Sequence, residues 1–227
     1  MEKLPTKTPL DKLLNGGLEK DTVTNIYGPP GSGKTNVVLS AVLSCCEKNK
    51  KVIYIDTEGS FSLERFEQLG GEESDLKKII FIEVHAWDEQ GKEIQKIEKL
   101  AEKGDVGFVA VDSLVALYRL ELDENNFQAI NKQLATQYSI LSKIARKYKV
   151  PVLVTNQVYS LRDEKIEMTS RAIAKYWSKT LIELKRLEKD NQRVAILRKH
   201  RSLPEGKSIE FEIIQNGLKE IGKFSIF

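Results

Sequence analysis

The chain is organised around one stretch, Gly28-Pro29-Pro30-Gly31-Ser32-Gly33-Lys34-Thr35. It matches the phosphate-binding pattern G-x-x-x-x-G-K-[S/T] at every fixed position. The preceding residues 23–27 (VTNIY) predict a strand, and residues 35–46 (TNVVLSAVLSCC) predict a helix with a broad apolar face. In that context backbone N–H groups turn inward around phosphate, Lys34 reaches the β- and γ-phosphates, and the Thr35 hydroxyl binds Mg²⁺. The loop therefore predicts ATP and Mg²⁺ as cofactors; a Gly/Pro-rich turn that matches by chance is the alternative.

The composition describes a globular chain with a highly charged surface. Of 227 residues, 41% are hydrophobic and 30% are charged, and the formal net charge is +3. We expect a single domain over residues 1–227, because the length suits one large α/β core and no stretch has a flexible linker's composition. The small net charge permits nucleic-acid binding through a local patch without indicating it.

Cysteine content and hydropathy bear on location. Cys45 and Cys46 are the only cysteines and lie next to each other, so zinc-site spacing is absent, and we expect buried, reduced helix residues. No apolar run approaches a membrane span, and the N-terminal residues lack the apolar region of a signal peptide. We expect a cytoplasmic protein without membrane contact.

Strand and helix signals alternate after the loop. Buried strands are predicted over 52–56, 79–84, 107–113 and 150–155, and helices over 89–103 and 127–148. Three further strand-like runs, 180–187, 194–200 and 208–214, indicate an antiparallel meander. Residues 114–126 are predicted to be irregular, and 159–170 to be a polar, mobile loop. The expected fold class is α/β: a mostly parallel twisted sheet flanked by helices, with a C-terminal antiparallel meander.

Carboxylates follow two of the predicted buried strands. Asp56-Thr57-Glu58-Gly59 ends one of them, and Asp112 ends another. Ligands of α/β proteins bind at the carboxyl ends of such strands. Because an apolar strand ending in Asp downstream of a phosphate loop is the expected second Mg²⁺-binding element, we assign Asp112, with Thr35, to the metal. The alternative is an Asp that caps the following helix.

Four segments then occur in a fixed order: GPPGSGKT (28–35), YIDTEGSF (54–61), VAVDS (109–113) and VTNQV (154–158). Together they resemble the core of the RecA/RadA recombinase family, from about residue 4 to the C-terminus. RadA carries an additional N-terminal helical DNA-binding domain, for which we expect no room here. The opening segment LDKLLNGG (10–17) and the triplet at 199–201 before LPEG (203–206) resemble the RadB group, the short archaeal paralogues of RadA. The resemblance implies a RecA-like P-loop ATPase core.

The resemblance also implies roles for individual residues. Glu58 matches a glutamate that orients the attacking water, a task that needs positioning more than strong basicity. Arg65 matches an arginine that stacks on adenine, for which a planar guanidinium is suited. Gln157 matches a glutamine that senses the γ-phosphate and passes its state to the next loop. The alternatives are a helix partner of a carboxylate for Arg65 and a local turn amide for Gln157.

Basic residues in two later segments are the candidate contacts to DNA. They are Arg162, Lys165, Arg171, Lys199, His200 and Arg201. The triplet at 199–201 has two functional readings, donors to DNA phosphates or to the γ-phosphate of a neighbouring subunit, and an exposed basic turn is the alternative. The segment 120–127 contains three carboxylates and no glycine. Since carboxylates oppose contact with a phosphate backbone, we expect weak DNA binding and little or no strand exchange.

The function implied is that of a RadB-like accessory protein of DNA recombination and repair. It would bind ATP and DNA, hydrolyse ATP weakly with Mg²⁺, contact the RadA recombinase or a Holliday-junction resolvase, form homo-oligomers and associate with the nucleoid. Three alternatives stay open: a small-molecule or nucleotide kinase with a P-loop, a ring-forming RecA-fold signalling ATPase, and a nucleotide-gated scaffold that barely hydrolyses ATP. An Arg-rich lid, which such kinases use, is not evident.

Overall fold

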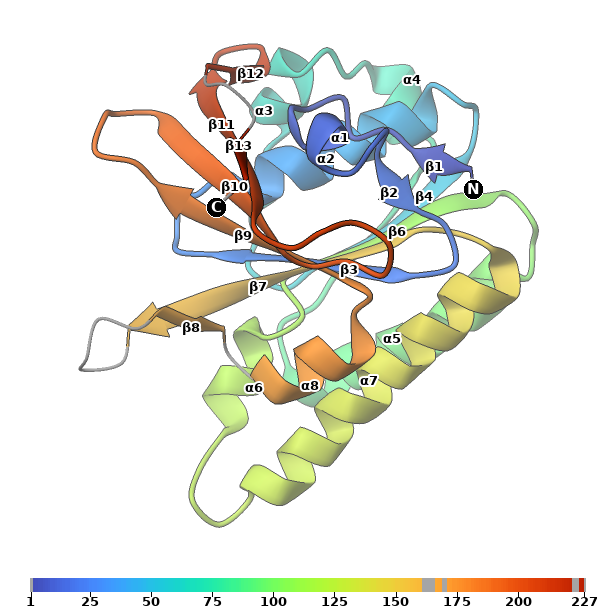
Figure 1. The fold of residues 1–227 in the computed structure, drawn as a ribbon. Helices are drawn as coiled ribbons and strands as arrows, with labels where there is room; N and C mark the ends of the chain where they lie inside the picture. The colour runs from blue at the N-terminus through green and yellow to red at the C-terminus, as the bar shows by residue number, and fades with distance from the viewer. Residues whose placement is uncertain (1, 161–165, 169–170, 222–224, 227) are drawn as a thin grey trace.

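The computed structural model describes residues 2–160, 166–168, 171–221 and 225–226 (Figure 1). Its strands are β1 (Lys3–Leu4), β2 (Leu18–Glu19), β3 (Val23–Gly28), β4 (Lys51–Asp56), β5 (Ile79–Glu83), β6 (Val106–Asp112), β7 (Val152–Ser160), β8 (Ile166–Met168), β9 (Thr180–Arg186), β10 (Gln192–Lys199), β11 (Lys207–Ile214), β12 (Gly217–Glu220) and β13 (Ser225–Ile226). Its helices are α1 (Leu10–Leu13), α2 (Lys34–Cys46), α3 (Leu63–Gln68), α4 (Glu73–Leu76), α5 (Trp87–Ala101), α6 (Ala116–Glu121), α7 (Phe127–Tyr148) and α8 (Arg171–Trp177).

The described strands other than β1 and β2 form one sheet. Its order is β12-β11-β10-β9-β3-β7-β6-β4-β5, with β13 beside β11 and β8 beside β7. The strands from β9 to β5 in this order pair in parallel, whereas β9, β10, β11 and β12 pair antiparallel. This confirms the predicted fold class, a mostly parallel sheet with a C-terminal antiparallel meander.

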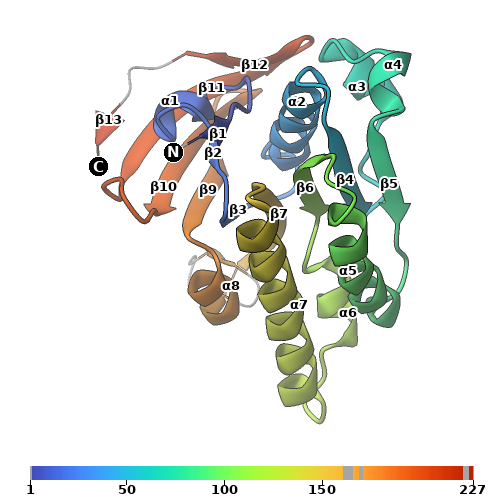
Figure 2. The ribbon, with the colours of Figure 1, turned by 90° about the vertical axis from the view of Figure 1, so that its right-hand side faces the viewer.

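Helices cover both faces of the sheet. Helices α1 to α4 lie on one face and α5 to α8 on the other (Figures 1 and 2). The strands alternate accordingly: Val52 and Tyr54 of β4 pack in the core beneath α2, and Ile53 and Ile55 in the core beneath α5 and α7. Such strands are buried on both sides, which explains why the sequence runs from 52 to 55 without a polar residue. Cys45 and Cys46 are free thiols buried on α2, as predicted.

The long helix α7 shows how the sequence sets a helix face. Apolar residues recur along α7 at helical spacing, namely Ile130, Leu134, Leu141 and Ile144. They are buried in the same core as Ile53 and Ile55 of β4. The helix ends at Tyr148, and the next residue, Lys149, adopts a left-handed conformation (φ 52°). Each buried apolar side chain of this kind contributes about 1.5–3 kcal/mol, which holds α7 along the sheet.

Most predicted boundaries agree with the structure within two residues, but two regions differ. Residues 116–121 of the stretch predicted as irregular form α6, because Leu117 and Tyr118 are buried in the core beneath α5 and α7. The stretch predicted as a polar, mobile loop contains the end of β7 and the strand β8, which pair antiparallel. The sequence also gave no signal for β1, β2, α4, β12 and β13, all of which are short.

The register of the parallel strands places the candidate site at one edge. Gly28 of β3 lies opposite Gln157 of β7, and Asp56 of β4 lies opposite Asp112 of β6. The phosphate loop and the polar strand ends therefore meet at the carboxyl edge of the sheet, where α/β proteins bind ligands.

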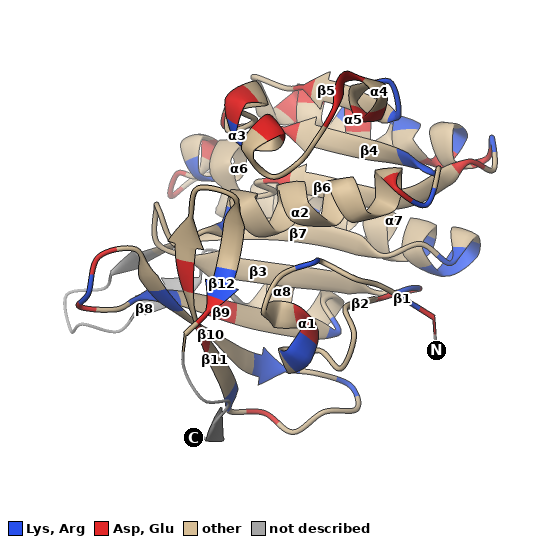
Figure 3. Cartoon of the chain, turned by 90° about the horizontal axis from the view of Figure 1, so that it is seen from above, with Lys and Arg blue, Asp and Glu red and all other residues tan. Residues whose placement is uncertain are grey.

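Charge of both signs is distributed over the elements. Figure 3 shows Lys and Arg segments interspersed with Asp and Glu segments, with basic residues gathered at the C-terminal end of α7. In the part of the chain that the structure describes, no helix has the length and hydropathy needed to span a membrane.

Candidate nucleotide-binding site

The loop from Gly28 to Lys34 connects β3 to α2. Gly28 is required by close packing, because a Cβ at this position would lie 2.5 Å from the Leu184 carbonyl oxygen and 2.8 Å from the Ser32 hydroxyl. Gly33 caps α2 with φ 97°, a conformation that other residues rarely adopt. The loop thus turns directly into the start of a helix, and the unpaired N–H groups there favour an anion.

Lys34 lies beneath this loop. Its Nζ donates to the carbonyl oxygens of Gly28 (2.9 Å) and Pro29 (3.1 Å), and the side chain is buried. Burial lowers the pKa of the ammonium below its ordinary value, while the nearby carboxylates of Asp112 and Glu58 act in the opposite direction. A buried ammonium group that is held by carbonyl oxygens at the N-terminus of a helix fits the role of a phosphate ligand.

Asp112 is the centre of a buried polar cluster at the end of β6. Its Oδ2 accepts from the hydroxyls of Thr35 (2.8 Å), Tyr54 (3.2 Å) and Ser60 (3.2 Å), and its Oδ1 accepts from Thr155. Burial raises the pKa of this carboxyl, although the Thr155 and Thr35 hydroxyls lower it. The structure therefore brings together the two residues assigned to Mg²⁺ from the sequence.

The metal assignment can be compared with the chemistry of the donors. The described residues contain no group of three or more His, Cys, Asp or Glu that could hold a metal alone. Mg²⁺ in nucleotide sites is commonly bound by one or two protein oxygens together with phosphate and water. The adjoining Thr35 hydroxyl and Asp112 carboxylate fit that donor set, and the loop beside them would supply the phosphate.

Asp56 shapes the neighbouring loop. Its carboxylate accepts backbone N–H groups from Glu58 (3.1 Å), Ser60 (3.1 Å) and Phe61 (2.9 Å), and it is buried. These three bonds fold the chain back after β4 and present the exposed side chain of Glu58 at the carboxyl edge. The sequence indicated the position of this carboxylate at a strand end but not its scaffolding role.

Glu58 and Gln157 are brought into direct contact. The Gln157 Nε2 donates to Glu58 Oε2 (2.7 Å), and the Ser113 hydroxyl donates to Glu58 Oε1. On its other side, Gln157 Oε1 accepts from Arg119 Nη1 (2.8 Å). Arg119 was not singled out from the sequence, because it lies in the stretch predicted to be irregular.

Arg65 makes contacts that the sequence did not predict. On α3, its guanidinium donates to Gln68 Oε1 (2.9 Å), to Asn36 Oδ1 on α2, and to the carbonyls of Ile214 (3.1 Å) and Gln215 after β11. The helix partner is thus an amide in place of a carboxylate. These bonds tie α3 to α2 and to the β11–β12 turn, and the assignment of Arg65 to adenine stays a prediction.

The triplet at 199–201 makes intrachain contacts. Lys199 Nζ donates to the Ser178 carbonyl (2.8 Å) just after α8, and Arg201 Nε lies 2.7 Å from a Glu19 oxygen. The His200 side chain is only 1% exposed, and its Nδ1 accepts from the backbone N–H of Ser202 and Leu203 (both 3.1 Å). Burial lowers the pKa of His200, while Glu19 opposes that effect. None of these contacts reaches the loop at 28–35, and the predicted roles toward DNA or a neighbouring subunit stay predictions.

Of the three other candidate DNA contacts, Arg162 and Lys165 lie outside the described residues, and Arg171 is the first residue of α8. A cation that sequence analysis missed is Arg193 of β10, whose Nε donates to the Gly31 carbonyl (3.0 Å) in the phosphate loop. The available signal in the sequence was an arginine directly before the apolar run 194–197 of a predicted strand.

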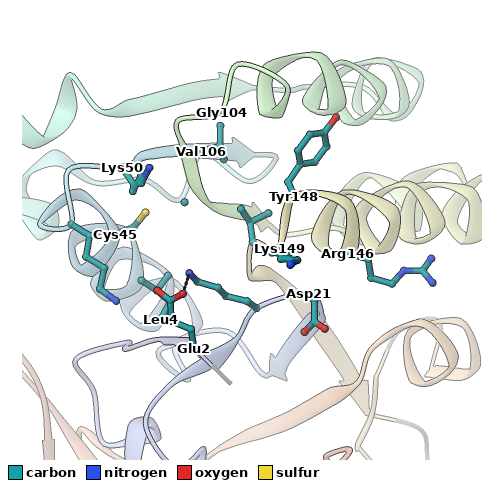
Figure 4. A pocket seen from close by; sticks show the side chains of 14 residues that line it. Glu2, Leu4, Asp21, Cys45, Lys50, Gly104, Val106, Arg146, Tyr148 and Lys149 are labelled. Atoms are coloured by element: carbon teal, nitrogen blue, oxygen red, sulfur yellow. Dashed lines mark ion pairs between the residues drawn. The ribbon is translucent and has the colours of Figure 1, made fainter.

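A separate hollow of about 840 Å³ lies at the amino edge of the sheet, away from this site. Figure 4 shows Cys45 and Lys50 on one side of it and Arg146, Tyr148 and Lys149 on the other. Burial raises the pKa of the Cys45 thiol to about 12, which keeps it unreactive. The cations lie in the last turn of α7 or just after the C-terminal ends of α2 and α7, where positive charge stabilises the exposed carbonyls.

Fold and site together define a P-loop α/β protein, and comparison places it in a family. A model of the Rad51 family matches residues 4–221, and the chain belongs to this family. It is 43% identical over 224 residues to the DNA repair and recombination protein RadB of Methanobrevibacter smithii, covering 95% of each chain. It is 41% identical over 221 residues to the protein of the same name from Methanosphaera stadtmanae, covering 95% of this chain and 94% of that one.

A solved structure gives the same result. The crystal structure of the RadB recombinase superposes with a TM-score of 0.83 at 35% identity, covering 96% of this chain and 100% of that chain. The resemblance to the RecA/RadA recombinase family, and within it to RadB, is thereby confirmed.

Proposed function

We propose that this chain is an ATP-binding protein of DNA repair and recombination that binds DNA and hydrolyses ATP slowly. Its relatives are named for repair and recombination, and its site has the parts that phosphoryl transfer needs. The observation that carries the proposal is the 2.8 Å contact between the Thr35 hydroxyl and the Asp112 carboxylate, beside buried Lys34. Thr35 and Asp112 lie 77 residues apart in sequence, and only the fold brings them together.

The residues of the loop would bind and orient the nucleotide. Its N–H groups and Lys34 would hold the phosphates, and Thr35 and Asp112 would hold Mg²⁺, which neutralises charge on the β- and γ-phosphates when bound. Buried hydroxyls around Asp112 keep its carboxylate oxygens directed at this position. Arg65, on the helix next to α2, is the proposed adenine contact.

Glu58 would orient the water that attacks the γ-phosphate. Its carboxylate is exposed at the carboxyl edge, and the Ser113 hydroxyl donates to it. Catalysis here depends on the placement of this carboxylate in a preorganised site more than on strong basicity. Gln157 is the proposed link between the γ-phosphate and the segment that follows β7.

DNA binding would be weak to moderate and largely independent of sequence. The acidic side chains of segment 120–127, among them Glu121 and Glu124, are exposed and would repel phosphates. We further propose contacts to the RadA recombinase or a Holliday-junction resolvase, formation of homo-oligomers, and association with the nucleoid in the cytoplasm. These partners are the ones that the resemblance to RadB implies.

The experiment that tests this function is DNA binding measured at two salt concentrations, with no nucleotide, ADP or a non-hydrolysable ATP analogue. We expect affinity to fall as salt rises, with a slope near −0.9 per phosphate contact on duplex DNA. Substituting Glu121 and Glu124 by Lys should raise affinity. A ring-forming signalling ATPase or a kinase would show no such salt-dependent binding, and efficient strand exchange by the protein alone would contradict the reading of segment 120–127.

A further inference from the structure

A continuous chain of polar contacts runs from α6 into the candidate site. Arg119 Nη1 donates to Gln157 Oε1 at 2.8 Å, and Gln157 Nε2 donates to Glu58 Oε2 at 2.7 Å. The other oxygen of Glu58 accepts from the Ser113 hydroxyl. Arg119 and Glu58 are thus connected through one side chain.

The chemistry of an amide makes this connection directional. A guanidinium only donates, so Arg119 can bind only the carbonyl end of Gln157. That contact leaves the NH₂ end facing Glu58, where it donates to the carboxylate. If the amide turned over, its carbonyl would face a carboxylate and repel it. Arg119 therefore determines which end of Gln157 meets Glu58.

The contact also holds Gln157 and Glu58 in a paired state. Both carboxylate oxygens of Glu58 accept a donor from the protein, and both ends of the Gln157 amide are engaged. A glutamine held between Arg119 and Glu58 is not free to turn toward a phosphate. Hydrolysis by way of Glu58 and Gln157 requires this pairing to loosen.

Arg119 lies where an outside event can reach it. Its neighbours Leu117 and Tyr118 anchor α6 in the core, whereas Arg119 itself is exposed and Leu120 is 80% exposed. The helix ends at Glu121 and leads directly into the exposed acidic segment before α7. A ligand on that segment could move Arg119 without disturbing the core.

We propose that Arg119 is a positioning residue that restrains ATP hydrolysis by holding Gln157 against Glu58. The inference rests on the proposed function, in which Glu58 orients the attacking water. When Arg119 withdraws, Gln157 is released from Glu58, and the carboxylate becomes available to water. The conformation of α6 thereby controls turnover, while nucleotide affinity, which depends on the loop at 28–35, is unchanged.

The test compares steady-state ATP hydrolysis of the full chain with that of Arg119→Ala. We expect kcat to rise about 2- to 10-fold, the range that loss of one hydrogen bond supports, with KM and ATP affinity unchanged. Arg119→Lys retains a donor and should stay near the parental rate. The matched control is Arg146→Ala, which removes an exposed arginine from α7 with the same change of charge and should leave kcat unchanged.

The double variant Arg119→Ala/Glu58→Gln shows whether the gain passes through Glu58. We expect it to be as inactive as Glu58→Gln alone; a gain that survives in the double variant would overturn the proposal. An unchanged or lower kcat in a folded Arg119→Ala protein would also overturn it. If parental hydrolysis is too slow to detect, a measurable rate in Arg119→Ala supports the restraint, and its absence refutes it.

Failure of the proposed function is distinguishable from failure of this inference. A parental protein that binds no ATP, or whose hydrolysis is insensitive to Glu58→Gln, contradicts the proposed function and this inference with it. A parental protein that binds ATP and hydrolyses it through Glu58, with no response to Arg119→Ala, contradicts the restraint alone.

Discussion

The hydroxyl of Tyr138 joins α7 to two strands, and its removal should cost substantial stability. It accepts from Asn25 Nδ2 of β3 (2.8 Å) and from Asn156 Nδ2 of β7 (3.1 Å). All three side chains are fully buried. Asn156 directly precedes Gln157, so this contact also anchors the strand end that carries part of the candidate site.

Tyr138→Phe removes the acceptor and keeps the ring. Two amide donors then stay buried without their partner, and each such group costs about 1–3 kcal/mol. Partial relaxation reduces the sum, so we expect the free energy of unfolding to fall by about 2–4 kcal/mol. The ring itself remains packed in the core, so the change reports the hydrogen bonds and not a cavity.

The assay is equilibrium urea unfolding followed by circular dichroism, with the midpoint and slope compared between variants. The matched control is Tyr148→Phe on the same helix, a half-buried residue whose hydroxyl donates to an exposed carboxylate, Glu102, at 3.3 Å. We expect that control to lose less than about 0.5 kcal/mol. Equal losses in Tyr138→Phe and Tyr148→Phe, at equal slopes, would refute the reasoning.

Three further predictions concern single carboxylates and the two histidines. Glu58→Gln should keep ATP affinity and lose roughly 100-fold or more in hydrolysis, because the shape stays and the water-orienting carboxylate goes; parental turnover would show that another group acts. Asp112→Asn should weaken Mg²⁺-dependent ATP binding in calorimetry without lowering the melting temperature, since it removes a charge whose pKa burial raises; a large loss of stability would contradict this. Burial lowers the pKa of His200 in the folded protein below its unfolded value of about 6.5. Below about pH 6.5 the unfolded chain therefore binds more protons than the folded one, and the free energy of unfolding should fall as the pH drops below this value. His200→Gln should flatten this dependence in pH-resolved melting, while His85→Gln, at an exposed histidine, should not.

The sequence was sufficient to predict the loop and the strands that lead to the site. The pattern at 28–35 requires a strand before it and a helix after it, and the apolar runs ending in Asp56 and Asp112 require a sheet buried on both faces. Since parallel strands align their carboxyl ends, the meeting of Thr35 with Asp112 followed from these local signals. Local periodicity and a motif sufficed because each of these features is encoded within a dozen residues.

Contacts between distant segments could not be predicted in this way. Arg119 lies 38 residues from Gln157 in sequence, and Gln157 lies 99 residues from Glu58, so no local pattern relates them. Arg65 has the spacing of a helix partner, yet it also donates to backbone carbonyls about 150 residues away, whose positions depend on the β11–β12 turn. His200 occurs in a basic triplet for which an exposed turn was one of the interpretations, and only the packing beside Glu19 shows that its ring is buried.

ATP affinity of Lys34→Ala is the most direct test of the central claim. Isothermal titration with Mg²⁺ and ATP would compare the parent, this variant and Lys77→Ala, which removes an exposed lysine from a surface ion pair. We predict that the parent and Lys77→Ala bind ATP alike and that Lys34→Ala binds at least about tenfold more weakly, with its melting temperature retained. Equal affinity in a folded Lys34→Ala protein would show that the loop at 28–35 does not bind the phosphates and would contradict the account.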